Sequence, residues 1–212
     1  MEGMNIMAIV IGFVIILISM TLHEAMHAFT SHWLGDDTAK INGRLTLNPL
    51  SHIDPITTIA LPLLLIAVGA QPFGAAKPVP FDPRRVRWGE YGAALVGLAG
   101  PLTNFFLAIL GAILIHNRID YQMPKEFLGT TSVMALWISI NVGFFVFNMI
   151  PFPPLDGSRV LYALAPRPLQ AVMESIESLG FAAIAIFIFL IFPLIQPIIN
   201  VVYDFIFRLF GL

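Results

Sequence analysis

The stretch SMTLHEAMHAFTSHWLG, residues 19–35, places two histidines and a glutamate inside a run that is otherwise typical of a membrane-buried helix. Titratable side chains at that depth are costly unless they pair with one another or hold an ion. On a helix, positions i and i+4 lie one turn apart on the same face, so His23 and His27 can bind one metal ion. Glu24 lies on a neighbouring face, from which it can act as a general base on a metal-bound water.

The composition is that of a membrane protein. Of the 212 residues, 58% are hydrophobic and only 11% are charged, which is too little charge for the surface of a soluble domain of this length. No basic block points to nucleic acid as a partner. The chain has no cysteine, so a metal site must use nitrogen and oxygen ligands. We therefore expect a single integral-membrane domain, residues 1–212.

Apolar segments and polar loops alternate along the chain, which predicts an all-α polytopic fold with about 4–6 transmembrane helices. The long apolar segments are residues 4–34, 89–115, 131–150 and 179–210. Residues 56–70 are apolar but would span only about 22 Å as a helix, which is less than a full crossing. In the loop before them, GRLTL at 43–47 alternates and is β-prone. An extended substrate could pair with this piece by strand addition.

A catalytic zinc site with two histidines needs a third protein ligand. Asp156, in PFPPLDG, follows an apolar segment at a point where prolines and a glycine turn the chain. It could also cap the helix that begins at DGSRVLYAL. His52, in NPLSHIDP, could line the site or stabilise its own turn. His32 lies about half a turn around the helix from His23 and faces away, and His116 lies at the polar end of a segment.

Three motifs in this order resemble the site-2 protease family: HEAMHA at 23–28, GPLTN at 100–104 and NMIPFPPLDG at 148–157. GRLTLNP and HIDP are similar to its compact prokaryotic members without PDZ or CBS domains. The resemblance covers nearly the whole chain. It implies an intramembrane zinc metalloendopeptidase that carries one Zn²⁺ per chain and performs regulated intramembrane proteolysis. Its substrates would be transmembrane proteins, cut in or near their membrane-spanning segments.

The resemblance also implies a role for each site residue. The metal ligands would be His23, His27 and Asp156, and Glu24 would be the catalytic base. Asn148 and Asn104 would be polar groups that line the site or steady the tetrahedral intermediate.

The position of Asp156 predicts the topology. His23 and His27 lie near the C-terminal end of the first segment and Asp156 follows the end of 131–150, so these two helices must run parallel to meet. That requires an odd number of crossings between them. Since 89–115 supplies one crossing, we expect residues 56–70 to dip into the membrane and return.

The positive-inside rule favours the same topology. If residues 56–70 cross, the Lys and Arg residues divide six to five between the two sides; if they do not, the division is eight to three. The eight are Lys40, Arg44, Lys77, Arg84, Arg85, Arg87, Arg159 and Arg167. We therefore expect a multi-pass protein of a prokaryotic cell membrane with its metal site toward the cytoplasmic side.

Two other functions fit part of the sequence. A non-catalytic metal-binding membrane protein, either a transporter or an adaptor, would need no base beside its ligands, and Glu24 counts against it. A prenyl-protein endopeptidase would need acidic ligands on another helix, and the close pair Glu174 and Glu177 lies outside the apolar spans. The sequence names no regulatory partner.

Overall fold

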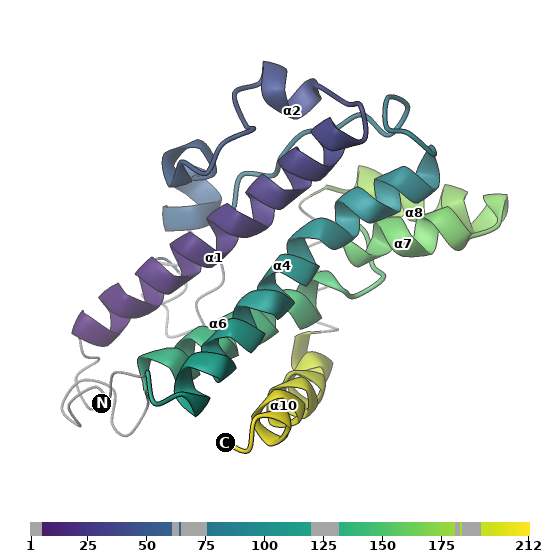
Figure 1. The fold of residues 1–212 in the computed structure, drawn as a ribbon. Coiled ribbons are helices and arrows are strands. Elements are labelled where there is room, and N and C mark those ends of the chain that lie inside the picture. The colour runs from purple at the N-terminus through teal and green to yellow at the C-terminus, as the bar shows by residue number, and fades with distance from the viewer. Residues whose placement is uncertain (1–5, 61–63, 65–75, 120–131, 181–182, 184–191) are drawn as a thin grey trace.

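The structure, a computed structural model, describes residues 6–60, 64, 76–119, 132–180, 183 and 192–212, and these are helices and loops with no strand among them (Figure 1). The expected all-α fold is confirmed at this level. The three longest helices of the site region are α1 (Ile6–Trp33), α4 (Glu90–His116) and α6 (Val133–Asn148). The remaining elements are α2 (Thr38–Ile41), η1 (Pro49–Ser51), η2 (Pro55–Ala60), α7 (Gly157–Leu164), α8 (Arg167–Ser178) and α10 (Phe192–Leu209).

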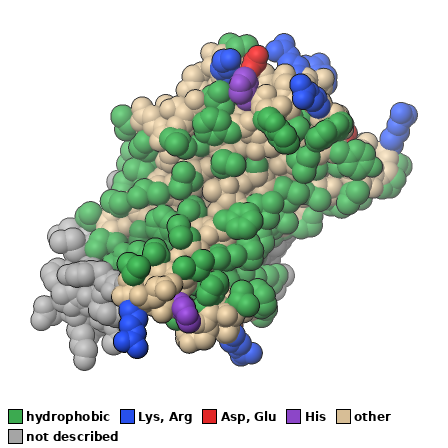
Figure 2. All heavy atoms as spheres, in the orientation of Figure 1, with side chains coloured by type: hydrophobic (Ala, Val, Ile, Leu, Met, Phe, Trp, Pro, Cys, Tyr) green, Lys and Arg blue, Asp and Glu red, His purple; other side chains and the backbone are tan. Residues whose placement is uncertain are grey.

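Within the part of the chain that the structure describes, two helices are long and apolar enough to cross a membrane, over Ile9–Trp33 and Glu90–His116, and the apolar helix α6 is shorter. Figure 2 shows hydrophobic side chains across the middle of the molecule, with Lys and Arg at its two ends. This is the distribution expected of a protein whose middle lies in lipid. The count of 4–6 transmembrane helices stays a prediction.

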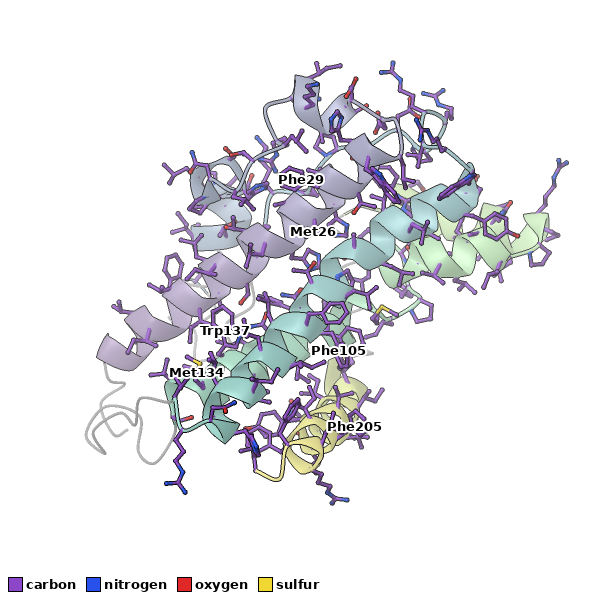
Figure 3. All side chains as sticks on the ribbon, in the orientation of Figure 1. Met26, Phe29, Phe105, Met134, Trp137 and Phe205 are labelled. Atoms are coloured by element: carbon purple, nitrogen blue, oxygen red, sulfur yellow. The ribbon has the colours of Figure 1, made fainter. Side chains whose placement is uncertain are left out.

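Helix α4 is the centre of the fold and packs against α1, α6 and α7. Small residues on α4 permit close packing: a methyl group at Gly111 would lie 2.9 Å from side-chain atoms of Ile138 and Trp137 on α6. The indole N–H of Trp137 donates to the carbonyl of Leu107 at 2.8 Å. Figure 3 shows Trp137 on α6 beside α4, whereas Met26 and Phe29 on α1 are 40% exposed, as lipid-facing side chains would be.

The segment that connects α1 to α4 begins and ends at the same end of these helices. The backbone N–H of Arg87 donates to the carbonyl of Leu34 at 2.9 Å, which joins the start and the finish of residues 34–87. Helix α4 then runs antiparallel to α1, and α6 runs in the direction of α1 (Figure 1). This is the parallel arrangement of α1 and α6 that the meeting of the histidines and Asp156 requires.

The predicted membrane-dipping segment, residues 56–70, lies largely outside the described residues. Its first part forms the π-helical turn η2, and Leu64 is helical. Past the segment, the N–H of Lys77 donates to the carbonyl of His52 at 2.9 Å, so the chain comes back to the loop that it left.

The expectation of a β-prone piece at 43–47 is wrong for this structure, in which GRLTL forms turns and bends. Gly43 has a φ of 65°, a left-handed conformation that reverses the chain. The N–H of Arg44 then bonds back to Ala39 at 2.8 Å and that of Thr46 to Arg44 at 3.0 Å. In a strand these N–H groups would point toward a neighbouring strand. The observed conformation of GRLTL therefore gives no support to pairing with an extended substrate by strand addition.

Candidate metal centre

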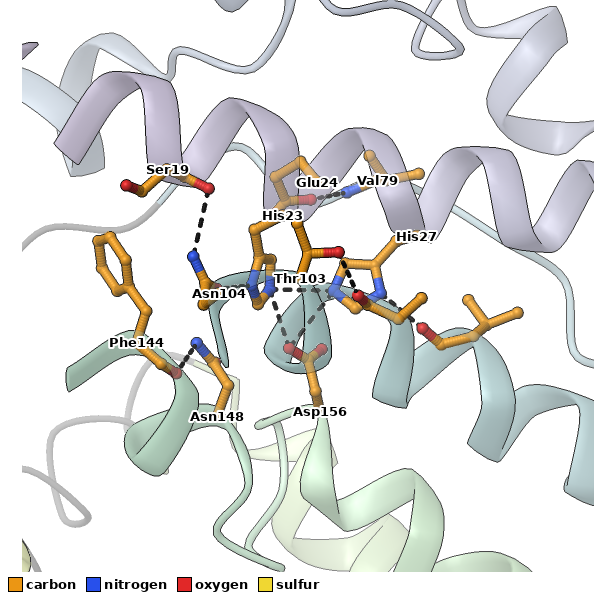
Figure 4. A network of polar contacts seen from close by, with 12 residues as sticks. Ser19, His23, Glu24, His27, Val79, Thr103, Asn104, Phe144, Asn148 and Asp156 are labelled. Atoms are coloured by element: carbon orange, nitrogen blue, oxygen red, sulfur yellow. Dashed lines mark hydrogen bonds and ion pairs between the residues drawn. The ribbon is translucent and has the colours of Figure 1, made fainter. Parts of the chain in front are cut away.

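The two histidines of α1 are held by acceptors on α4. The Nδ1 atom of His23 lies 2.6 Å from Oδ1 of Asn104, and Nδ1 of His27 lies 2.6 Å from the carbonyl oxygen of Val96. Both histidines are 7% exposed. Each imidazole is therefore buried with one nitrogen already bonded to an oxygen (Figure 4).

The hydrogen-bond network assigns the tautomer of both rings. The amide nitrogen of Asn104 donates to Oδ1 of Asn141 at 3.0 Å and to the carbonyl of Ser19 at 3.4 Å, so its Oδ1 is left to accept from His23. A carbonyl and an amide oxygen only accept, so Nδ1 is the protonated nitrogen of each neutral ring. The lone pairs at Nε2 of His23 and His27 are then free to bind a metal.

Asp156 completes a three-ligand group with these two nitrogens. Its Oδ2 lies 3.1 Å from Nε2 of His23 and 3.4 Å from Nε2 of His27, and the two Nε2 atoms are 3.0 Å apart. Zinc–ligand bonds of about 2.0–2.2 Å at tetrahedral angles place ligand atoms about 3.3–3.6 Å from one another. The three ligand atoms lie slightly closer together than this, and their nitrogen and oxygen chemistry suits zinc, so the group could hold such an ion.

Two glycines bring Asp156 to α1. Gly157, at the start of α7, fits against the carbonyl of Met149, where a Cβ would clash. A methyl group at Gly97 on α4 would lie 2.9 Å from the carbonyl oxygen of Asp156. Asp156 stands at the N-cap position of α7 but its side chain makes no capping hydrogen bond. The alternative that it serves as a helix cap is therefore not realised, because its carboxylate faces the histidines.

Glu24, the predicted base, is on α1 between the two histidines. Its Oε2 accepts a hydrogen bond from the backbone N–H of Val79 at 2.9 Å. Figure 4 shows this bond between Glu24 and Val79 beside α1. One carboxylate oxygen of Glu24 is thus bonded to the backbone.

The three tentative site residues lie outside the ligand group. Asn104 is completely buried, with its side-chain oxygen at His23 and its amide nitrogen donating to Asn141, so its role beside the site stays a prediction. Asn148 donates to Phe144 of its own helix at 3.0 Å. His52 is 2% exposed and its Nε2 lies 2.9 Å from the carbonyl of Thr46, the turn-stabilising bond of the alternative reading.

The remaining candidate residues are engaged elsewhere. His32 pairs with Asp37 at 2.6 Å, as expected for a residue that faces away, and His116 bonds to the carbonyl of Phe210 at 2.8 Å. The acidic pair on α8 binds side chains of α7: Glu174 accepts from Tyr162 and Glu177 from Arg159.

Two residues of the centre were missed in the sequence. Asn141 orients Asn104, and the signal for it was an asparagine in the middle of the apolar segment 131–150. Gly100 lies so close to the ligands that a methyl group there would stand 2.5 Å from Nε2 of His23. The signal was the glycine of GPLTN, which the sequence could not distinguish from other small residues of that helix.

Comparisons with known proteins agree with this centre. Residues 111–192 match the model of peptidase family M50. The chain is 38% identical over 203 residues to YwhC of Bacillus subtilis, named as a zinc metalloprotease, with 92% of this chain and 89% of that protein covered. It is 32% identical over 190 residues to Rip2 of Mycolicibacterium smegmatis, also named as a zinc metalloprotease, with 87% of this chain and 66% of Rip2 covered. No solved structure matches the chain.

Proposed function

Because the chain belongs to peptidase family M50, the site-2 protease family, and is a zinc metalloprotease, we propose that it hydrolyses peptide bonds in or near transmembrane segments of other membrane proteins. The observation that carries this proposal is the meeting of two imidazole nitrogens and a carboxylate oxygen within 3.4 Å between membrane-length helices. Titratable groups gathered at such a place are costly unless they serve an ion or a reaction.

The proposed ligands of one Zn²⁺ are His23, His27 and Asp156. When bound, zinc supplies a Lewis acid for the scissile carbonyl and brings the pKa of water close to neutral. The acceptors on α4 support this assignment, because metal-binding histidines commonly donate their other ring N–H to an oxygen. Here Asn104 and the carbonyl of Val96 are those oxygens.

Glu24 is the proposed general base and acid. Its carboxylate would take a proton from the attacking water and return it to the leaving amine as the peptide bond breaks. A metal-binding protein without catalysis would have no use for a carboxylate held beside its ligands. The hydrogen bond from Val79 to Oε2 supports a fixed orientation for this group.

The proposed arrangement in the membrane is a single multi-pass domain, residues 1–212, with the metal centre toward the cytoplasmic side. The bond between Arg87 and Leu34 supports an even number of crossings within residues 34–87, and zero is the simplest. Water and substrate would reach the centre from the side of Asp156, whose side chain is 24% exposed. A helical substrate would have to unwind locally, since its peptide bonds are hydrogen-bonded and shielded.

The test is the Glu24→Gln variant, incubated with a membrane fraction whose newly formed peptide ends are mapped by mass spectrometry. The matched control is Glu90→Gln, which changes an exposed glutamate on α4. We expect wild type and Glu90→Gln to produce new ends within or beside transmembrane segments, and Glu24→Gln to produce none while it retains zinc. Cleavage by Glu24→Gln at the wild-type rate, or cleavage only in soluble domains, would overturn the proposal.

A further inference from the structure

The segment Pro78-Val79-Pro80 offers a single backbone donor beside α1. Proline has no N–H, so the only amide proton of this tripeptide belongs to Val79, and it is bonded to Glu24. A residue that precedes a proline is confined largely to extended conformations, which restricts both Lys77 and Val79. The donor is thus presented by a stiff, extended piece of backbone, residues 77–80, which we call the arm.

The arm is anchored by a buried arginine. Arg44 is 6% exposed, and its Nη2 donates to the carbonyl of Lys77 and, at 3.3 Å, to that of Pro78. Among the described residues no carboxylate pairs with this guanidinium, although a buried charge without a counter-charge is costly. Its contacts go to two consecutive carbonyls, which a planar guanidinium can reach together. Nη2 is therefore satisfied at the arm, whereas the buried Nε has no hydrogen-bond partner among the described residues.

Two further contacts seat the arm on α1 and on the loop of His52. The N–H of Lys77 donates to the main-chain carbonyl of His52 at 2.9 Å, and the His52 ring is itself tied to Thr46. The Val79 side chain is buried against Ala28 of α1 and Ala39 of α2. The arm is thus bonded at Lys77 and Pro78 and packed at Val79, and its Val79 N–H donates to Glu24.

We propose that the arm is a positioning element for the general base, with Arg44 as its anchoring residue. Arg44 holds the carbonyls of Lys77 and Pro78, these fix the Val79 N–H, and that N–H fixes Oε2 of Glu24 so that Oε1 exchanges the proton. Arg44 touches no reacting atom and acts through the backbone. The inference rests on the proposed role of Glu24 as base.

The first test measures how firmly the arm holds the Val79 N–H and does not depend on activity. Hydrogen–deuterium exchange in detergent can resolve the Val79 amide, since its neighbours on both sides are prolines. We expect slow exchange in wild type and at least about 10-fold faster exchange in Glu24→Ala and in Arg44→Gln, because each loses one link that keeps the amide closed. The control is Arg84→Gln, which changes an arginine whose side chain is 89% exposed and should leave the exchange rate unchanged.

The second test separates positioning from a general structural role. The substrate is a peptide or membrane protein that the wild type cleaves. Arg44→Gln should lower kcat by about 10–100-fold, because the Glu24 carboxylate would be displaced by on the order of 1 Å. KM and zinc content should stay near the wild-type values. Arg44→Lys should recover part of kcat, since an ammonium reaches one carbonyl at a time. Val79→Pro, which removes the N–H, should lower kcat at least about 10-fold more than Val79→Ala.

The outcomes distinguish this inference from the function on which it rests. Unchanged kcat in Arg44→Gln despite faster Val79 exchange would overturn the positioning role, as would a kcat loss that merely follows loss of zinc. Equal kcat in Val79→Pro and Val79→Ala would also overturn it. A different result, cleavage by Glu24→Gln, would overturn the proposed function. The exchange rate of the Val79 amide does not depend on activity and can be measured whether or not the proposed function holds.

Discussion

Gly100 of α4 lies directly against the ring of His23, and a methyl group at that glycine would stand 2.5 Å from Nε2. Nonbonded carbon and nitrogen atoms do not approach so closely, so the ligand group and any side chain at this position exclude each other. Helix α4 thus forms the closed wall of the centre. Water and substrate would have to reach the ligand atoms from another side.

Gly100→Ala should therefore weaken zinc binding. The added methyl group must displace one of the two imidazoles, and we expect at least a roughly 10-fold loss of zinc affinity, as for other changes that misorient ligands. Zinc content after dialysis against a graded chelator measures this. Gly143→Ala is the control, because a Cβ there meets nothing within 4 Å. Equal zinc affinity in both variants would mean that α4 can shift at Gly100 to accommodate the added methyl group.

Asn104→Ala should also weaken zinc binding, by about 10–100-fold, because His23 loses the acceptor that holds its ring and tautomer. Asn104→Asp keeps an acceptor for Nδ1 and should stay closer to wild type. The exposed residue Asn117, which bonds only within its own helix, provides the control Asn117→Ala. If Asn104→Asp binds zinc as poorly as Asn104→Ala, the interaction with His23 is not the reason for the loss.

Asp156→Ala and His52→Ala decide the third ligand. We expect one zinc per chain in wild type and in His52→Ala, and little in Asp156→Ala, because the Asp156 carboxylate lies 3.1 Å from His23 whereas the His52 ring is bonded to Thr46. Elemental analysis of the detergent-purified proteins provides the measurement. The reverse result would move the ligand into the loop and remove the reason for parallel α1 and α6.

Gly111→Ala should destabilise the packing of α4 on α6. A Cβ at Gly111 would lie 2.9 Å from side-chain atoms of Ile138 and Trp137, and such overpacking costs about 1–3 kcal/mol. The midpoint of thermal unfolding in detergent should fall. Gly12→Ala, on α1, where a Cβ meets nothing within 4 Å, should leave the midpoint unchanged or raise it slightly. A fall of the same size in both variants would contradict a specific close contact.

His23, Glu24, His27 and Asp156 could be named from the sequence as candidates for the metal centre, and the roles of the tentative residues stay predictions. His23, Glu24 and His27 follow from helical periodicity alone, and Asp156 followed from resemblance and from the turn after an apolar segment. For Asn104, only packing could distinguish an asparagine that orients a ligand from one that faces the substrate. For GRLTL, the alternation of apolar and polar residues predicted a strand. The chain instead turns at Gly43, and the Arg44 side chain donates a hydrogen bond to the carbonyl of Pro78 in the arm.

By itself the sequence determined an all-α membrane protein with two histidines and a glutamate on one helix, because composition and a spacing of four residues act locally. Tertiary structure alone decided which partners those side chains meet: His23 finds its acceptor 81 positions away and its carboxylate 133 away, and Glu24 finds its donor 55 away. Such contacts depend on how closely helices approach. That approach is set by small residues of α4 whose role emerges only when all of their neighbours are in place.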